Sequence, residues 1–367
     1  MTVIIETVSH CNLSCRYCYL GQEKHTMKIP IGLVERVLSE VLRYNDKECP
    51  TEFIWHGGEP LLAGLDFFQE ICKIQAGAFR EYKIENSLQT NGVLLDGEWA
   101  RFFLNNNFHV GVSLDGPRDI HNGNRVFPTG RGSFDIILDN VLSARRNGLN
   151  LGALCVITKA SLGRQADIYA FFKDLSLGFD FGAVTTTAPM AITPDEFAEF
   201  TIRLFDLWFT DPNPTVTIDP FTMLVTAMLS SRPVPQCIFE GNCVESYIAV
   251  VPDGTVFPCD RFAAYPEFAL GNLWRDDLET IMNSPVRARL LSRARIPFFE
   301  CSTCTIRKFC NGGCPHEALV YNGGFFTPGY FCSSYRQFFL YAIERIQRQI
   351  DAATVGSSLR ACQVLET

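Results

Sequence analysis

Short strand-like runs alternate with amphipathic helical stretches over roughly the first 185 residues of the chain. Six runs are rich in β-branched and aromatic residues, which is typical of strands, and they span Val3–Val8, Glu52–His56, Lys83–Thr90, His109–Leu114, Leu151–Ile157 and Asp180–Val184. Between the first two runs, apolar residues recur at helical spacing and mark one face of a helix, formed by Val34, Val37, Leu38, Val41 and Leu42. This alternation predicts a parallel sheet covered by helices.

Further helices fit the same pattern, over Leu65–Ala78, Gly97–Asn106, Phe134–Arg146 and Arg164–Leu175. Six strand–helix units predict an α/β fold in the form of a partial (β/α)6 barrel. In such sheets the chemistry gathers at the carboxyl ends of the strands and in the loops that follow them. Strand ends are therefore where we look for functional residues.

The alternation of strands and helices stops after Pro194, and two predicted helices follow, the second ending near Ser230. From there to Cys332 the chain is dense in glycine, proline and aromatics, with one hairpin that turns at Pro252-Asp253-Gly254. So little periodic pattern predicts a region that needs metals to fold, closed by a helix over residues 335–352. We expect three parts: a barrel with linking helices (1–230), a cysteine-rich domain (231–334), and a C-terminal helix and tail (335–367).

Composition narrows the possible partners. Hydrophobic residues make up 47% of the 367 residues and charged residues 20%, which is ordinary for a globular protein. The formal net charge of −8 and the lack of a basic run argue against nucleic acid as a partner. No basic leader and no run of about 18 apolar residues occurs, so we expect a cytoplasmic protein without a membrane partner.

The 15 cysteines are distributed unevenly, and most of them fall in two groups. Clustered thiols in a chain without a secretion signal indicate metal ligands rather than disulfides. The first group, Cys11, Cys15 and Cys18, follows the first predicted strand. A [4Fe–4S] cluster takes four ligands, so three thiolates leave one iron open for a small chelating molecule. A zinc site completed by His10 is the alternative.

The C-x3-C-x2-C spacing at the end of a first strand resembles the radical S-adenosylmethionine (SAM) superfamily. The run Trp55-His56-Gly57-Gly58-Glu59-Pro60 is similar to that family's GGEP motif, which holds the amino group of SAM. Similar segments, 87–92 and 113–117, end the third and fourth strands. The resemblance implies that SAM is bound by Tyr17, Gly57, Gly58, Glu59, Gln89, Asn91, Ser113, Asp115 and Arg125, the arginine near the SAM carboxylate.

The second group holds eight thiols, the number that two fully ligated [4Fe–4S] clusters require. Two zinc ions are the alternative. The spacing resembles the SPASM domain of peptide-modifying radical SAM enzymes. That resemblance implies three [4Fe–4S] clusters in all, with the nearer auxiliary cluster on Cys237, Cys243, Cys259 and Cys314, and the outer one on Cys301, Cys304, Cys310 and Cys332.

The resemblance also implies a reaction. SAM cleavage at the first cluster gives a 5′-deoxyadenosyl radical, which takes a hydrogen atom from the substrate. Fully ligated auxiliary clusters suit electron transfer, so net substrate oxidation is expected, with flavodoxin or ferredoxin as an electron donor. In anaerobic sulfatase-maturating enzymes, which the chain resembles from end to end, the aspartate that matches Asp260 is the proposed general base. His56 is a second catalytic candidate.

Two substrate classes fit this machinery. We favour a peptide or protein maturase that installs a crosslink or a similar change in a ribosomally synthesised peptide (RiPP), because the runs 56–64 and 259–262 resemble that branch. His56 and Leu61 also flank the GGEP run where the sulfatase-maturating family has glutamine and threonine, and Leu20 stands where that family has a tyrosine. The runner-up is an anaerobic sulfatase maturase that converts cysteine or serine to formylglycine. A non-catalytic iron–sulfur carrier or a zinc-stabilised binding module would have no use for the strand-end motifs.

Overall fold

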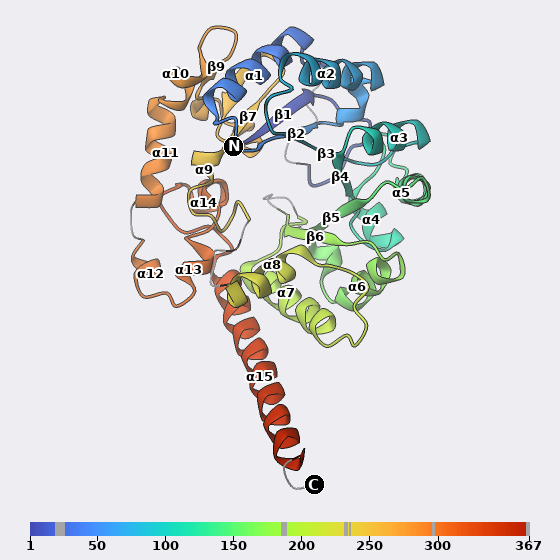
Figure 1. Ribbon diagram of the computed structural model, residues 1–367, viewed down its shortest axis with the longest axis vertical. Coiled ribbons are helices and arrows are strands. Elements are labelled where there is room, and N and C mark those ends of the chain that lie inside the picture. Colours follow the sequence, from blue (N-terminus) through green and yellow to red (C-terminus); the bar gives the residue numbers. More distant parts are fainter. Residues whose placement is uncertain (19–25, 185–188, 231–233, 235, 296–297, 365–367) are drawn as a thin grey trace. The chain divides into compact units, whose positions relative to one another are not determined.

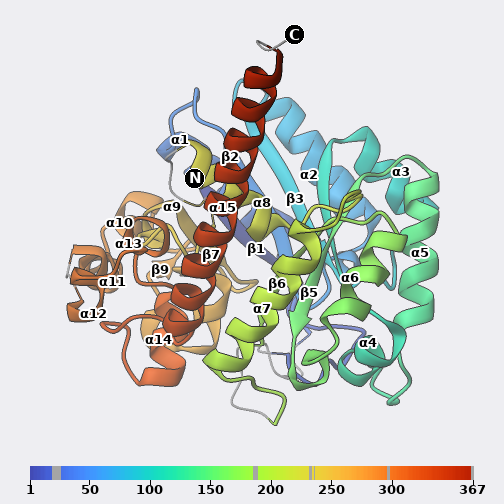
Figure 2. The ribbon, with the colours of Figure 1, turned by 90° about the horizontal axis from the view of Figure 1, so that it is seen from below.

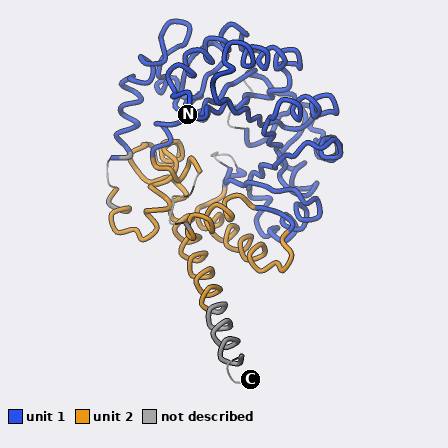
Figure 3. Tube along the Cα trace, viewed as in Figure 1, with its two compact units in different colours: residues 1–191, 215–217, 242–296 blue, residues 192–214, 218–241, 297–367 orange. Residues whose placement is uncertain are grey.

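The computed structural model describes residues 1–18, 26–184, 189–230, 234, 236–295 and 298–364, so Leu20 lies outside the described residues. The chain forms two compact units, drawn in Figure 3. Unit 1 comprises residues 1–191, 215–217 and 242–296, and unit 2 comprises residues 192–214, 218–241 and 297–367. Each unit combines segments that are far apart in the sequence. The boundaries 1–230, 231–334 and 335–367 stay a prediction.

Unit 1 is built on a nine-stranded sheet in the order β6-β5-β4-β3-β2-β1-β7-β8-β9. The strands are β1 (Thr2–Val8), β2 (Thr51–Gly57), β3 (Ile84–Thr90), β4 (Phe108–Ser113), β5 (Leu151–Ile157), β6 (Phe179–Ala183), β7 (Tyr247–Val250), β8 (Thr255–Phe257) and β9 (Gly271–Asn272). Strands β1 to β6 pair in parallel and in sequence order. The predicted parallel α/β sheet is confirmed.

The helices between these strands lie along the sheet in Figures 1 and 2. They are α1 (Ile31–Tyr44), α2 (Leu65–Ala78), α3 (Gly97–Asn105), α4 (Arg118–Asn124), α5 (Phe134–Arg146) and α6 (Gln165–Asp174). The apolar face predicted for α1 is fully buried. Short 3-10 helices η1 (Pro60–Ala63) and η2 (Lys159–Ser161) follow β2 and β5. Aromatic packing around Phe68, which contacts Trp55, Trp99 and Phe108, fills the space between sheet and helices.

The predicted hairpin after the first cysteines of the second group does form, but it also extends the barrel sheet. β7 pairs in parallel with β1, from Thr2↔Tyr247 to Ile5↔Val250, and in antiparallel fashion with β8. The short helix α9 (Cys243–Ser246) precedes β7. After β8, unit 1 continues through η3 (Asp260–Ala264), η4 (Pro266–Phe268), α10 (Leu278–Met282) and α11 (Pro285–Arg295). The consequence is that η3, which starts at Asp260, belongs to the same unit as the barrel.

Unit 2 is helical and comprises α7 (Pro194–Phe209), α8 (Asp219–Ser230), α12 (Phe299–Ser302), α13 (Arg307–Cys310), α14 (Pro315–Asn322) and α15 (Cys332–Val364). α15 is longer than predicted and packs on α7 through aromatic contacts such as Phe205–Phe338. Phe221 of α8 joins the same cluster. Within the described ranges, no helix combines the length and the apolar character that crossing a bilayer requires.

Candidate active site

The first thiol group sits in a loop that the chain itself holds in place. Backbone N–H groups of Ser14 and Arg16 donate to the carbonyl oxygens of Val126 and Asn124, at 2.7 and 2.9 Å. Cys11, Cys15 and Cys18 are all free thiols. Burial raises the pKa of Cys11 to about 11 and that of Cys15 to about 12, and each thiolate also feels the charge of the Cys18 thiolate.

Gly57 and Gly58, at the end of β2, lie in close contact with this loop. Gly57 has a φ of +124°, and a Cβ there would lie 2.5 Å from the carbonyl oxygen of Val8. A Cβ on Gly58 would lie 2.1 Å from the carbonyl oxygen of His10. The N–H of Gly58 donates to Val8 and that of Glu59 donates to His10, at 2.8 and 3.0 Å. Only residues without a side chain allow this approach.

The Glu59 side chain is fully buried, and its carboxyl group is hydrogen-bonded to other groups of the chain. Its Oε1 accepts hydrogen bonds from the Thr90 hydroxyl (2.6 Å) and the Leu61 N–H (3.1 Å), and its Oε2 accepts one from the Asn91 N–H (2.7 Å). Burial raises the pKa of this carboxyl to about 7, although these three donors act to lower it. The carboxyl therefore joins the loops after β2 and β3.

Amide side chains at the end of β3 reach toward both neighbouring loops. The Asn91 Nδ2 donates to Asn12 Oδ1 at 2.7 Å and to the sulfur of Cys11 at 3.5 Å. The Gln89 Nε2 donates to the hydroxyl of Ser113, at the end of β4, at 3.1 Å. These contacts connect the thiol loop with two successive strand ends.

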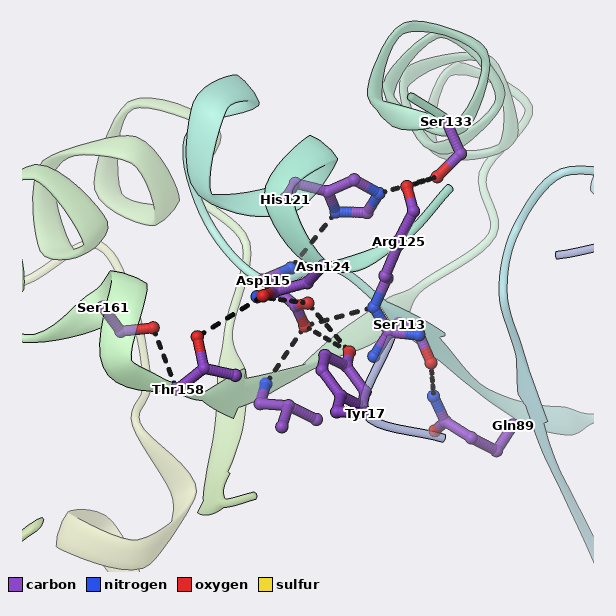
Figure 4. A network of polar contacts seen from close by, with 11 residues as sticks. Tyr17, Gln89, Ser113, Asp115, His121, Asn124, Arg125, Ser133, Thr158 and Ser161 are labelled. Atoms are coloured by element: carbon purple, nitrogen blue, oxygen red, sulfur yellow. Dashed lines mark hydrogen bonds and ion pairs between the residues drawn. The ribbon is translucent and has the colours of Figure 1, made fainter. Parts of the chain in front are cut away.

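Asp115 is the centre of a buried polar network, shown in Figure 4. Its fully buried carboxylate accepts hydrogen bonds from the Tyr17 hydroxyl (2.8 Å), the Arg125 Nε (3.1 Å) and the Asn124 Nδ2 (3.2 Å). The Val156 N–H donates to it at 3.1 Å. The Arg125 guanidinium also lies 5.3 Å from the centre of the Tyr17 ring. The network brings together Tyr17, Asp115 and Arg125, three of the predicted SAM-site residues.

A neutral histidine is hydrogen-bonded to the backbone of this network. His121 is completely buried, and burial lowers its pKa to about 4. Its Nδ1 accepts the backbone N–H of Asp115 at 3.3 Å, and its Nε2 lies 3.0 Å from the Ser133 hydroxyl. Since Nδ1 is an acceptor, Nε2 carries the proton and donates to Ser133. Sequence reasoning missed His121, because no motif distinguishes it from an ordinary helical histidine.

The two predicted catalytic residues line one small cavity. His56 at the end of β2 and Asp260 at the start of η3 both border it, together with Glu6 of β1. Glu6 is the register partner of His56 in the adjoining strand. Sequence reasoning missed Glu6, although its place two residues before the end of an inner strand was the signal that could have found it.

The second thiol group divides between the units. Cys301, Cys304, Cys310 and Cys332 all belong to unit 2, and electrostatic coupling of Cys310 and Cys332 to each other and to both Cys301 and Cys304 indicates one group. Burial raises the pKa of Cys310 to about 12. Cys237 and Cys314 also lie in unit 2, whereas Cys243 and Cys259 lie in unit 1.

The described cysteines are free thiols. No disulfide joins any of the cysteines from 11 to 332. In the same described part of the chain, no three His, Cys, Asp or Glu side chains converge on one metal ion. Ligands of a four-iron cluster each bind a different iron and so stand farther apart than zinc ligands do. The positive charge of bound iron would stabilise the thiolate form of grouped cysteines.

Two family models match the chain. The Radical SAM superfamily model matches residues 5–161, and the SPASM model, described as an iron–sulfur cluster-binding domain, matches residues 237–305. These ranges cover the strand-end site and most of the second cysteine group.

Curated relatives match nearly end to end. The chain is 31% identical over 356 residues to a cysteine-type anaerobic sulfatase-maturating enzyme of Clostridium perfringens, covering 92% of this chain and 95% of that one. It is 28% identical over 364 residues to a serine-type anaerobic sulfatase-maturating enzyme of Bacteroides thetaiotaomicron, covering 90% and 86%. The solved structure of native anSMEcpe with bound AdoMet and Cp18Cys peptide matches with a TM-score of 0.86 at 28% identity, covering 96% of this chain and 99% of that one.

Proposed function

Because the chain belongs to the anaerobic sulfatase-maturating enzymes of the radical SAM superfamily, we propose that it oxidises a cysteine or serine side chain of a protein substrate to formylglycine. The observation that carries this proposal is the similarity to a sulfatase maturase over 92% of the chain. The similarity favours formylglycine formation over the crosslinking reaction that the residues around His56 led us to prefer.

The first thiol group is the proposed site of the catalytic [4Fe–4S] cluster. Cys11, Cys15 and Cys18 would hold three irons and leave the fourth to SAM. When bound, the reduced cluster and SAM supply hydrogen-atom abstraction, and the auxiliary clusters supply an electron acceptor. The outer auxiliary cluster would be held by the four coupled thiols of unit 2, and the nearer one by Cys237, Cys243, Cys259 and Cys314.

The strand-end residues divide into two roles in this proposal. Gly57 and Gly58 let the end of β2 lie directly against the thiol loop, and Gln89, Asn91 and Ser113 supply amide and hydroxyl groups for the cosubstrate at the ends of β3 and β4. A second set, namely Glu59, Asp115, Tyr17 and Arg125, is buried and already satisfied in large part by contacts within the chain. We assign the second set to positioning the loops that receive SAM.

Asp260 and His56 act on the substrate in this proposal. Oxidation of a CH2SH or CH2OH group removes one hydrogen atom from carbon, one proton from sulfur or oxygen, and one electron. The carboxylate of Asp260 accepts the proton, and His56 across the cavity orients that carboxylate. Where the substrate is cysteine, water then hydrolyses the C=S group to an aldehyde, and the sulfur leaves as hydrogen sulfide.

Peptide crosslinking is the second candidate. It is favoured by His56 and Leu61, which flank the glycine pair where the sulfatase-maturating family has glutamine and threonine. His56 borders the substrate-side cavity, so this change alters the group that a substrate would meet.

One anaerobic assay tests both functions. The reconstituted protein, with about twelve irons per chain, is given SAM, a reductant such as reduced flavodoxin, and a cysteine-containing sulfatase peptide. Two further peptides, in which serine or alanine replaces the cysteine, are assayed in parallel. We expect 5′-deoxyadenosine and an aldehyde that a hydrazide captures from the cysteine or serine peptide and not from the alanine peptide. A product that loses two hydrogens without hydrazide capture would instead indicate a crosslink, and deoxyadenosine without product from any sulfatase peptide would overturn formylglycine formation.

A further inference from the structure

Glu6 is an ionisable residue on the inner face of the barrel sheet to which the proposed reaction gives no role. It lies on β1, in register with His56 on β2. On the other side β1 pairs with β7, whose nearby residues Ala249 and Val250 carry no charge. The Glu6 side chain is half-buried, and its place near the carboxyl end of β1 is where barrel enzymes carry their chemistry.

Glu6 shares a cavity with both predicted catalytic residues. The cavity has a volume of about 10 Å³, which is room for about one water molecule. Its polar walls are Glu6, His56 and Asp260, and its apolar walls include Ile4 and Val251. A single water in such a space can bridge carboxyl groups that do not touch.

The charges that face Glu6 come from three elements. β2 contributes His56, the turn between β7 and β8 contributes Asp253, and η3 contributes Asp260. Burial raises the pKa of Glu6 to about 7, and the negative charges of Asp260 and Asp253 act in the same direction. Glu6 therefore exchanges its proton near neutral pH.

We propose that Glu6 is a second proton acceptor on the substrate side of the site and holds the proton that the substrate's thiol or hydroxyl group loses. This inference rests on the proposed function. The carbon–hydrogen bond gives its hydrogen atom to the deoxyadenosyl radical. The S–H or O–H bond gives its proton to the Asp260 carboxylate, which passes it through the cavity to the Glu6 carboxylate. The remaining electron goes to an iron–sulfur cluster, a C=S or C=O bond forms, and Glu6 later releases the proton to solvent.

The matched variants are Glu6→Gln and Glu52→Gln. Glu52 lies on β2 and accepts hydrogen bonds from Ser87 and Thr2 at 2.6 and 3.3 Å, away from the cavity. Both substitutions keep the side-chain volume and remove one ionisable carboxyl group. Iron content and thermal unfolding establish that each variant folds and carries its clusters.

The first measurement needs no substrate. Infrared difference spectra of the reconstituted holoenzyme across a pH titration should show a protonated carboxyl band that disappears with a midpoint near 7. Glu59, whose pKa is also about 7, contributes to this band in every variant, so the band should lose the Glu6 contribution in Glu6→Gln and keep its full amplitude in Glu52→Gln. A spectrum of Glu6→Gln that equals that of the wild type over the whole titration would overturn the inference, whatever the enzyme's substrate.

The second measurement is the amount of product per deoxyadenosine as a function of pH. Because Glu6 must be ionised to accept a proton, product per deoxyadenosine should rise with pH through about 7 in the wild type and in Glu52→Gln. In Glu6→Gln it should be about tenfold lower or less and lack this rise. If Glu6→Gln shows the same pH profile as the wild-type enzyme, the inference about Glu6 is overturned and formylglycine formation stands. If the wild-type enzyme makes no aldehyde, formylglycine formation is overturned, and the infrared measurement alone decides on Glu6.

Discussion

The two cysteine regions of this chain are held in place by different means. The loop of Cys11, Cys15 and Cys18 is supported by backbone hydrogen bonds, by close glycine contacts and by the buried network around Asp115. Three thiols of unit 2, Cys301, Cys304 and Cys310, stand on or beside helices α12 and α13, each of four residues. Helices so short have no stability of their own.

This difference fits the different tasks proposed for the two regions. A cluster that must exchange ligands at one iron needs a loop whose position does not depend on that iron. A fully ligated cluster that carries electrons can also serve as the structural centre of its domain. We therefore expect unit 1 to have a preformed site and the cysteine segment of unit 2 to have a site that forms with its metals.

The largest effect should follow removal of all iron from the full-length protein. Hydrogen exchange in residues 298–334 should accelerate by about ten-thousandfold or more, because the metals hold this segment, while strands β1 to β6 keep their protection. Mass spectrometry of the exchanged peptides compares the two segments within one sample. Equal loss of protection in both, or in neither, would contradict the distinction.

The next largest effect concerns the support of the first site. Asp115→Asn leaves the Arg125 guanidinium buried without its carboxylate, which should lower the free energy of unfolding by about 3–5 kcal/mol. The control is Asp119→Asn, which removes an exposed carboxylate paired with Arg164 and should change little. Urea unfolding of unit 1, followed by its tryptophan fluorescence, measures both. Similar values for the two variants would show that the network around Asp115 does not support the site.

The barrel elements could be predicted from the sequence because their apolar residues keep a regular period. α2 runs over Leu65–Ala78 as predicted, and β5 over Leu151–Ile157. The site could be placed because parallel strands end at one edge, so motifs far apart in the sequence, such as Gly57–Glu59 and Gln89–Asn91, had to meet. The relation of these motifs to one another followed from topology alone.

Other features depend on packing that local pattern does not encode. The pairing of β7 with β1 joins residues 2–5 to residues 247–250, and no periodicity reports so distant a partner. Likewise, the GGEP-like motif indicated that Glu59 has a function but not that its carboxyl is buried under donors from the next loop. Glu6 went unnoticed because a charged residue in a strand usually faces solvent.

A smaller effect should appear in the pH dependence of stability through Glu59. Its pKa of about 7 in the folded protein lies above the ordinary 4.5, so its contribution to stability is complete below 4.5 and is lost as the pH rises through 7. Glu59→Gln has no such dependence. The difference in free energy of unfolding between wild type and variant should therefore shift in favour of the variant by roughly 3 kcal/mol over this range. Urea titrations at several pH values measure it, and a constant difference would show that Glu59 does not titrate there.

The smallest expected effect tests the contact between the glycine pair and the thiol loop. Gly58→Ala places a methyl group against the carbonyl of His10, so the loops must move apart and SAM affinity should fall about tenfold, or about 1.4 kcal/mol. Gly32→Ala in α1 adds a methyl group with nothing within 4 Å and should leave affinity unchanged. Calorimetric titration of SAM into the reconstituted proteins gives both values. Unchanged affinity in Gly58→Ala would mean that the thiol loop yields readily, and that its position, like that of the second cysteine region, is set by the cluster rather than by the chain.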